Sequence, residues 1–195
     1  MRELIINEVF FAILEGIFIF LIFSSVILNE RKEYIFGNKH KVLLFIGLYS
    51  IFSFWVTLSF PNGYHTLILT FFTGVVLSVI SKKSIALSVV AVTIAVIFII
   101  VTEALLVILL NLFFQISIND IITNPTIKMG FSTIAKIVQI TVGILLFRSN
   151  LKPIIKVSAN KESVNLLNYS VLGIYLMSIF IASLRFSLHS GCDSP

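Results

Sequence analysis

The sequence predicts an all-α, polytopic integral membrane protein in the form of one six-helix transmembrane bundle. Of its 195 residues, 58% are hydrophobic and only 12% are charged, whereas a soluble domain has about 45–50% apolar residues. The apolar residues form long runs, and a hydrocarbon core about 30 Å thick requires roughly 20 of them at a helical rise of 1.5 Å. The runs do not alternate apolar with polar residues, which excludes the strands of a β-barrel.

Six apolar runs define the predicted helices, and residues 1–186 are expected to form one transmembrane domain. The third run is short and the fourth is long. The longest polar segments, "NERKEYIFGNKHK" and "RSNLKPIIKVSANKES", leave no room for a separate soluble domain, and residues 187–195 are expected to be an unstructured tail. The runs are 4–28, 42–60, 64–80, 85–114, 127–147 and 166–184.

Each run is bounded by local features of the sequence. The first run lacks a basic n-region and a cleavage site of small residues, so it is expected to remain as a helix. Pro61, Asn62 and Gly63 provide a tight turn before the third run, and Lys82 and Lys83 separate the third from the fourth. The segment "QISINDIITNP" supplies cap and turn residues before the fifth run. A basic segment precedes the sixth.

Basic residues are concentrated in the first, third and fifth loops. These loops hold ten Lys and Arg residues, against three in the opposite loops and ends. By the positive-inside rule the ten are cytoplasmic, so the N-terminus and the C-terminus are both predicted outside. The net charge of +5 is then explained by topology and by contact with the lipid bilayer, and no nucleic acid is expected as a partner. The ten are Arg31, Lys32, Lys39, Lys41, Lys82, Lys83, Arg148, Lys152, Lys156 and Lys161.

Three charged residues and one amide are predicted to share one level near the middle of the membrane. From the outer ends of their helices, Glu15 and Glu103 each lie roughly 16 Å deep and Lys136 about 13 Å deep. Gln139 lies one turn deeper than Lys136. A charge at this depth costs about 2.5–3.5 kcal/mol, so these side chains are expected to face the bundle interior, with Lys136 between the two carboxylates.

The role of these residues stays open at this point. One interpretation is that the charges neutralise one another and fix the helix register. Another is a site for a ligand or an ion. A third is that the helix rotations differ and one group is alone or protonated. Ala12 and Gly16, which are four residues apart beside Glu15, form a small-xxx-small pair that would allow another helix to approach closely.

Four further polar residues are candidates for the outer mouth of such a site. Glu8 precedes Glu15 by nearly two turns and is expected on the same helix face. Asn62 and His65 lie at the outer hairpin, where His65 is a candidate ligand contact, although an interfacial histidine without a function is the commoner case. Asp120 lies in the second outer loop and is expected first to cap a helix or turn and second to take part in recognition.

The sequence offers no catalytic motif, no metal site and no cofactor. Its single cysteine, Cys192, lies in the tail. The accessory gene regulator B peptidases are membrane cysteine endopeptidases of similar length, but they would need a paired His and Cys, and His65 has no cysteine near it. The substrate-capture subunits of vitamin importers are also six-helix proteins of this size, so a transporter is the alternative function. The broken helices of many secondary transporters are not indicated, because all four prolines lie in loops or ends.

Three segments carry a family resemblance. They are "PNGYHTLILTFFTGVVLSVISKKSIALSVV", the long fourth run with the acidic residue of "VTEALLVILLNLFF", and "ISINDIITNPTIKMGFSTIAKIVQITVGILLFR" with the basic loop after it. This pattern of hydropathy, loops and polar positions resembles the N-terminal membrane domain of the accessory gene regulator C (AgrC-like) sensor histidine kinases. The resemblance covers nearly the whole chain and contains no short catalytic motif.

The resemblance implies a multi-pass receptor in a bacterial cell membrane, part of a two-component quorum-sensing system. Many such receptors sense a secreted extracellular peptide, and relatives act as homodimers. Full-length relatives continue into a cytoplasmic kinase domain, but no phosphoacceptor histidine or ATP-binding motif follows the last run here. Because the C-terminus is predicted outside, a kinase would need a seventh helix first. The chain is therefore expected to be truncated before that helix, with recognition on the outer half of the bundle.

Overall fold

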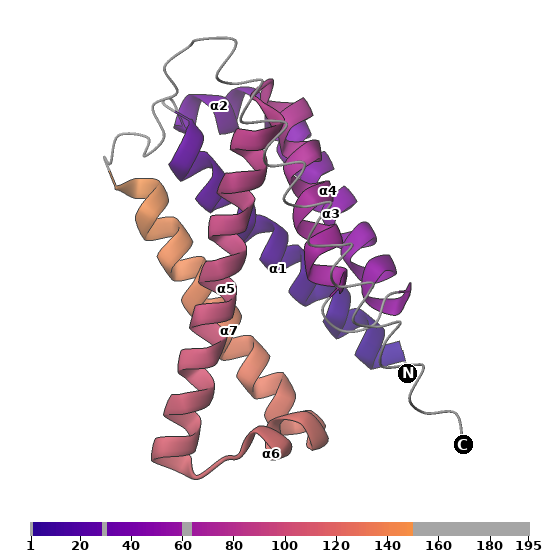
Figure 1. The fold of residues 1–195 in the computed structure, drawn as a ribbon, viewed down its shortest axis with the longest axis vertical. Helices are drawn as coiled ribbons and strands as arrows, with labels where there is room; N and C mark the ends of the chain where they lie inside the picture. The colour runs from indigo at the N-terminus through magenta and orange to yellow at the C-terminus, as the bar shows by residue number, and fades with distance from the viewer. Residues whose placement is uncertain (1, 29–30, 60–63, 150–195) are drawn as a thin grey trace, which may run out of the picture.

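The structure is a computed structural model that describes residues 2–28, 31–59 and 64–149. These residues fold almost entirely into helices, and no strand occurs among them (Figure 1). The predicted all-α class is therefore confirmed for this part of the chain. The predicted helix at 166–184, the tail at 187–195 and the turn at 61–63 lie outside the described residues.

Five helices coincide with predicted apolar runs, and their ends lie within three residues of the prediction. They are α1 (Arg2–Ile27), α3 (Lys39–Ser59), α4 (Tyr64–Ser81), α5 (Ile85–Phe114) and α7 (Pro125–Arg148). Four of them, α1, α3, α5 and α7, are long and apolar enough to cross a membrane. Helix α4 has 18 residues and is about 27 Å long at 1.5 Å per residue. The apolar helices indicate a membrane protein.

Two short helices occupy segments that the sequence predicts as loops, so the prediction is wrong there. They are α2 (Arg31–Gly37) and α6 (Ile118–Thr123). Helix α2 is tied to the end of α4 by Tyr34, whose hydroxyl donates to the carbonyl oxygen of Ile80 at 2.9 Å. Burial raises the pKa of this phenol above its usual value. Helix α6 begins with a capping box formed by Ser117 and Asp120. Both helices are too short and too polar to appear as apolar runs.

Capping interactions determine where the long helices begin and end. Lys82 has a φ of 55°, a left-handed conformation that terminates α4 and allows a tight turn. Two residues later Ser84 caps α5, because its Oγ accepts a hydrogen bond from the N–H of Leu87 at 3.3 Å. Asn124 caps α7 by accepting from the N–H of Thr126 at 3.0 Å. Helices α4 and α5 therefore form a hairpin with almost no loop.

Helix α1 lies at the centre of the described bundle and packs against α3, α5 and α7 (Figure 1). Phe18 in its middle is fully buried. A Cβ on Gly16 would lie 2.9 Å from the ring of Tyr49 on α3, so only glycine allows the two helices this separation. The close approach predicted for the Ala12–Gly16 pair is confirmed at Gly16.

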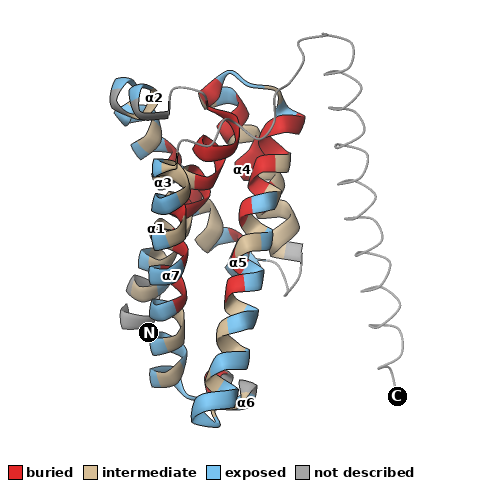
Figure 2. Cartoon of the chain, turned by 90° about the vertical axis from the view of Figure 1, so that its left-hand side faces the viewer, coloured by how far each residue is buried: buried red, intermediate tan, exposed pale blue. Residues whose placement is uncertain are grey.

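Buried residues gather in the half of the bundle that carries α2 and the α4–α5 turn (Figure 2). On α5 they extend from Ala86 to Thr102, and on α7 they begin at Ala135. Toward the other end α5 and α7, which cross near the middle of the bundle, diverge from each other (Figure 1). Large apolar side chains are exposed there, among them Leu105 and Phe113, which is compatible with contact with the lipid bilayer.

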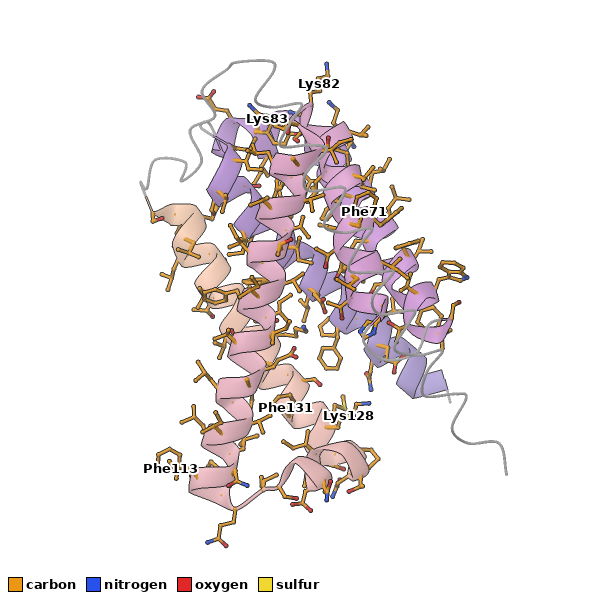
Figure 3. All side chains as sticks on the ribbon, viewed as in Figure 1. Phe71, Lys82, Lys83, Phe113, Lys128 and Phe131 are labelled. Carbon is orange, nitrogen blue, oxygen red and sulfur yellow. The ribbon has the colours of Figure 1, made fainter. Side chains whose placement is uncertain are left out.

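The basic connections among the described residues lie at one end of the molecule. Figure 3 shows Lys82 and Lys83 at the end that carries α2, and Lys128 near α6 at the opposite end. The connection from α1 to α3, which contains α2, and the turn between α4 and α5 therefore lie at the same end of the bundle. This arrangement is required by the predicted topology, in which the basic loops all lie on one side of the membrane.

Cysteine labelling tests whether the basic end of the bundle faces the cytoplasm. Asn119→Cys is expected to react with a membrane-impermeant thiol reagent in intact cells, whereas Asn38→Cys is expected to be protected, because Asn38 adjoins the basic end of the bundle. Cys192 is changed to Ser in both variants. A membrane-permeant reagent should label both sites and serves as the control for accessibility. Labelling of Asn38→Cys alone by the impermeant reagent would reverse the orientation.

Candidate functional site

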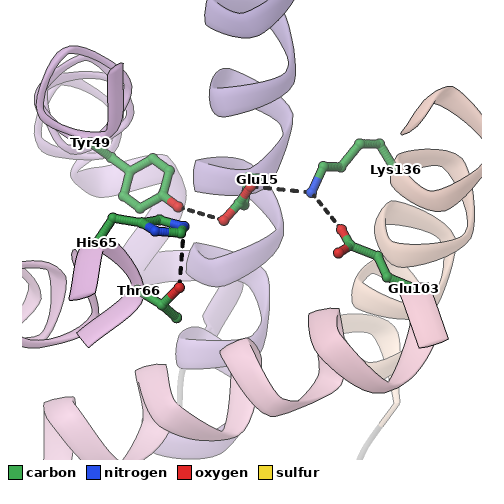
Figure 4. Close-up of polar contacts among 6 residues, drawn as sticks. All are labelled: Glu15, Tyr49, His65, Thr66, Glu103 and Lys136. Atoms are coloured by element: carbon green, nitrogen blue, oxygen red, sulfur yellow. Dashed lines mark hydrogen bonds and ion pairs between the residues drawn. The ribbon is translucent and has the colours of Figure 1, made fainter. Parts of the chain in front are cut away.

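Lys136 lies between two carboxylates, as the sequence predicts (Figure 4). Its Nζ is 3.2 Å from Glu15 Oε2 and 3.6 Å from Glu103 Oε1. The three residues come from α7, α1 and α5, and they meet because α1 packs against both other helices. The Lys136 side chain is 8% exposed, whereas those of Glu15 and Glu103 are 26% and 40% exposed. The ammonium is therefore withdrawn into the bundle while the carboxylates keep an accessible side.

Tyr49 on α3 is a member of this network that the sequence prediction omits. Its hydroxyl donates to Glu15 Oε1 at 2.8 Å (Figure 4), so Glu15 uses one oxygen for Tyr49 and the other for Lys136. Tyr49 lies ten residues after the first residue of α3, about 15 Å from the basic end. This depth matches that of Glu15 and would have identified the residue, since a buried phenol usually finds a hydrogen-bond partner.

Gln139 lies on α7 close to the predicted depth. It is fully buried on α7, but within the described residues neither its Nε2 nor its Oε1 has a hydrogen-bond partner. Three residues, or about 4.5 Å along the helix axis, separate it from Lys136. This spacing agrees with the predicted depth, and its inclusion in the polar network stays a prediction, because no hydrogen bond among the described residues joins the amide to Lys136 or to either carboxylate.

A cavity of about 230 Å³ adjoins the network. Helices α1, α3, α4 and α5 line it, and both carboxylates, Glu15 and Glu103, belong to the lining. No Lys or Arg of the described residues does. The rest of the wall combines aliphatic side chains with hydroxyl groups, the latter from Ser53, Thr57, Thr66, Thr70 and Thr73 in addition to Tyr49.

The four outer-mouth candidates have different positions. His65 lines the cavity, and Figure 4 shows its ring beside Thr66. Glu8 is exposed and lies outside the cavity lining. Asp120 is a cap: its Oδ2 accepts from the hydroxyl and from the N–H of Ser117, each at 2.7 Å, and these bonds hold the pKa of the carboxyl below its usual value. Asn62 lies outside the described residues. Of the three candidates that the structure describes, only His65 is therefore part of the cavity wall.

The arrangement provides hydrogen-bond acceptors and negative charge in a partly enclosed space at membrane depth. It can hold a polar or cationic group and exclude lipid from it. Among the described residues no group of three His, Cys, Asp or Glu side chains is placed to hold a metal ion. Comparisons with protein-family models, with curated proteins and with solved structures give no match for this chain.

Proposed function

We propose that the chain is the membrane sensor of a bacterial two-component signalling system, similar to AgrC-like receptors, and that it recognises a secreted peptide from outside the cell. In this proposal both termini lie outside, the basic loops are cytoplasmic, and residues 166–184 supply the sixth transmembrane helix. The cavity beside Glu15 and Glu103 is the observation that supports a receptor most directly, since a ligand site at membrane depth requires polar groups held inside the bundle.

The position of the cavity supports entry from the outer side. His65 and Thr66 belong to its lining and lie at the start of α4, next to a connection that is external in the proposed topology. The densely buried part of the bundle is at the opposite end (Figure 2). A ligand that arrives from outside would therefore reach the cavity without crossing the packed core.

Continuous helices favour the receptor over the transporter. Many secondary transporters bind their substrate where helices are broken, whereas α1, α3, α5 and α7 each run without interruption in the described residues. The ion pairs of Lys136 also connect α7 to α1 and α5 across the middle of the bundle. A polar cavity by itself suits both functions, so uptake should be measured beside binding.

Filling the cavity is expected to abolish peptide binding. Val96 lines the cavity, whereas its neighbour Ile97 is 54% exposed. Val96→Phe should therefore weaken binding by about tenfold or more, because the ring occupies the ligand's space, and Ile97→Phe should bind as the unaltered chain does. The probes are synthetic peptides encoded by small secreted-protein genes beside this gene, and fluorescence anisotropy with the chain in nanodiscs measures binding.

Two further measurements decide the outcome. Thermal unfolding in detergent shows whether Val96→Phe still folds, so that lost binding can be assigned to the filled cavity. Uptake of labelled vitamins into proteoliposomes, with an importer ATPase present, tests the transporter. Vitamin uptake without binding of any of the peptides would reject the receptor function and favour a substrate-capture subunit of a vitamin importer.

A further inference from the structure

The wall of the cavity carries an excess of negative charge. Glu15 and Glu103 both line it, while Lys136, which neutralises one of them, is not part of the lining. One carboxylate is therefore left without a counter-charge in this group of three. An uncompensated charge at membrane depth is strongly unfavourable. A ligand that brings a positive charge would remove this penalty.

Glu103 is the carboxylate better placed to receive such a ligand. Both oxygens of Glu15 are engaged, one by Tyr49 and one by Lys136. Glu103 approaches Lys136 only through Oε1, at 3.6 Å, and its Oε2 has no hydrogen-bond partner among the described residues. Its side chain is also the most exposed of the three, at 40%. A cationic group in the cavity would therefore find one accessible carboxylate oxygen.

Several hydroxyl groups of the lining can accept hydrogen bonds but have already donated their protons. Thr70 donates to the carbonyl oxygen of Thr66, and Thr73 to that of Leu69, both at 2.6 Å. Thr57 donates within its own helix at 2.9 Å. A hydroxyl has one proton and two lone pairs, so each of these oxygens is left as an acceptor. The lining thus favours a ligand group with several N–H donors.

The volume of the cavity limits what can enter. Sites that enclose a drug-sized ligand have about 300–1,000 Å³, and this cavity has about 230 Å³. It accommodates one side chain or one chain end rather than a whole peptide. Leu69 and Val92 are among the aliphatic residues of the wall and would contact the apolar stem of such a group.

We infer that the cavity binds a primary ammonium group on an apolar stem, as the anchor of a larger ligand. Glu103 is its main partner, and the threonine oxygens of the lining are acceptors for further polar groups of the ligand. A peptide offers this group at its amino terminus or on a lysine side chain. The inference rests on the proposed receptor function for the identity of the natural ligand, but the chemical preference of the cavity can be measured without that ligand.

Three probes with one skeleton test the preference: phenethylammonium, its trimethylated quaternary analogue and phenethyl alcohol. The chain is purified in detergent, and the shift of its thermal unfolding with probe concentration gives each affinity. The primary ammonium is expected to bind about tenfold tighter than the alcohol, because it forms charge-assisted hydrogen bonds. It should also bind tighter than the quaternary analogue, which has the charge but no N–H.

Glu103→Gln and Glu8→Gln are matched variants, because each removes one carboxylate but only Glu103 lines the cavity. Glu103→Gln should abolish the preference for the ammonium over the alcohol, and Glu8→Gln should retain it. Folding of Glu103→Gln is expected, since Lys136 keeps Glu15 at 3.2 Å.

Two results would overturn the inference. One is equal binding of phenethylammonium and phenethyl alcohol, and the other is a preference that survives in Glu103→Gln. Absence of peptide binding together with a retained ammonium preference would instead reject the receptor function and leave the cavity's chemistry standing. The two proposals therefore fail in different experiments.

Discussion

Lys136→Met is expected to lower the stability of the bundle by about 3–5 kcal/mol, the usual cost of breaking a buried ion pair by removing one partner. The change removes the ammonium that lies 3.2 Å from Glu15 and 3.6 Å from Glu103 and leaves both carboxylates uncompensated. Glu15→Gln should cost less, because Lys136 retains Glu103 and the glutamine oxygen can still accept the proton of Tyr49. Thermal unfolding in detergent measures both effects.

The double variant, Glu15→Gln with Lys136→Met, should recover much of the loss, since both charges of the closer pair are gone. Glu103 then has no ion-pair partner among the described residues, but its side chain is 40% exposed. Together the variants form a double-mutant cycle. Additive effects would show that Glu15 and Lys136 are not coupled and would make Glu103 the better partner for Lys136. Glu8→Gln, on the exposed part of α1, is the control and should leave stability unchanged.

The same double variant separates the structural from the functional interpretation of these charges. If stability and peptide binding both recover, the charges serve assembly of the helices. If stability recovers and binding does not, at least one of them contacts the ligand. We expect the first result, because the double variant retains Glu103, the carboxylate proposed to receive the ligand's positive group, and Lys136 does not line the cavity.

Gly74→Ala is expected to separate α4 from α5 and to destabilise the protein by about 1–3 kcal/mol, the usual cost of overpacking. A Cβ at this position would lie 2.5 Å from Cγ2 of Val89, 2.8 Å from its Cα and 3.1 Å from its N. Two of these atoms belong to the backbone, so a rotamer change cannot relieve the collision. Adding Val89→Ala to Gly74→Ala should therefore restore only part of the thermal stability.

Gly47→Ala on α3 is the matched control. Gly47 is exposed, and no heavy atom lies within 4 Å of a Cβ built on it. Alanine is also favoured over glycine in a helix by about 0.5–1 kcal/mol, so the unfolding temperature should stay the same or rise. If Gly74→Ala left the unfolding temperature as unchanged as Gly47→Ala does, the close contact between α4 and α5 would be contradicted.

The long helices were predictable because the membrane imposes a length and a composition on each of them. Ile85–Phe114 was located to the residue, since charged and capping residues bound one uninterrupted apolar run. Helices α2 and α6 were missed because short helices outside the apolar runs are subject to neither constraint. Their positions depend on single contacts, such as the Tyr34 hydroxyl on the carbonyl of Ile80, which composition does not reveal.

The charged residues of the site were predictable from depth, because a charge inside a membrane needs a partner at its own level. This reasoning brought Glu15, Glu103 and Lys136 together. It did not reach Tyr49, whose ring is apolar enough to pass as part of a membrane helix, although its hydroxyl needs a partner. For Gln139 it gave the depth, but among the described residues no partner for the amide is present. Depth fixes one coordinate of a side chain, whereas contact depends on helix rotation as well.

The α4–α5 hairpin has a consequence for how the chain is inserted during synthesis. Helix α4, about 27 Å long, leaves the ribosome first and is joined through the turn at Lys82 to α5, which has 30 largely apolar residues. We expect α4 to remain at the translocon until α5 emerges, so that both enter the lipid as one unit with Gly74 already against Val89. Lys136 is synthesised only afterwards, on α7. Until α7 is inserted, Glu15 and Glu103 therefore lie in the membrane without the ammonium that pairs with them in the folded bundle.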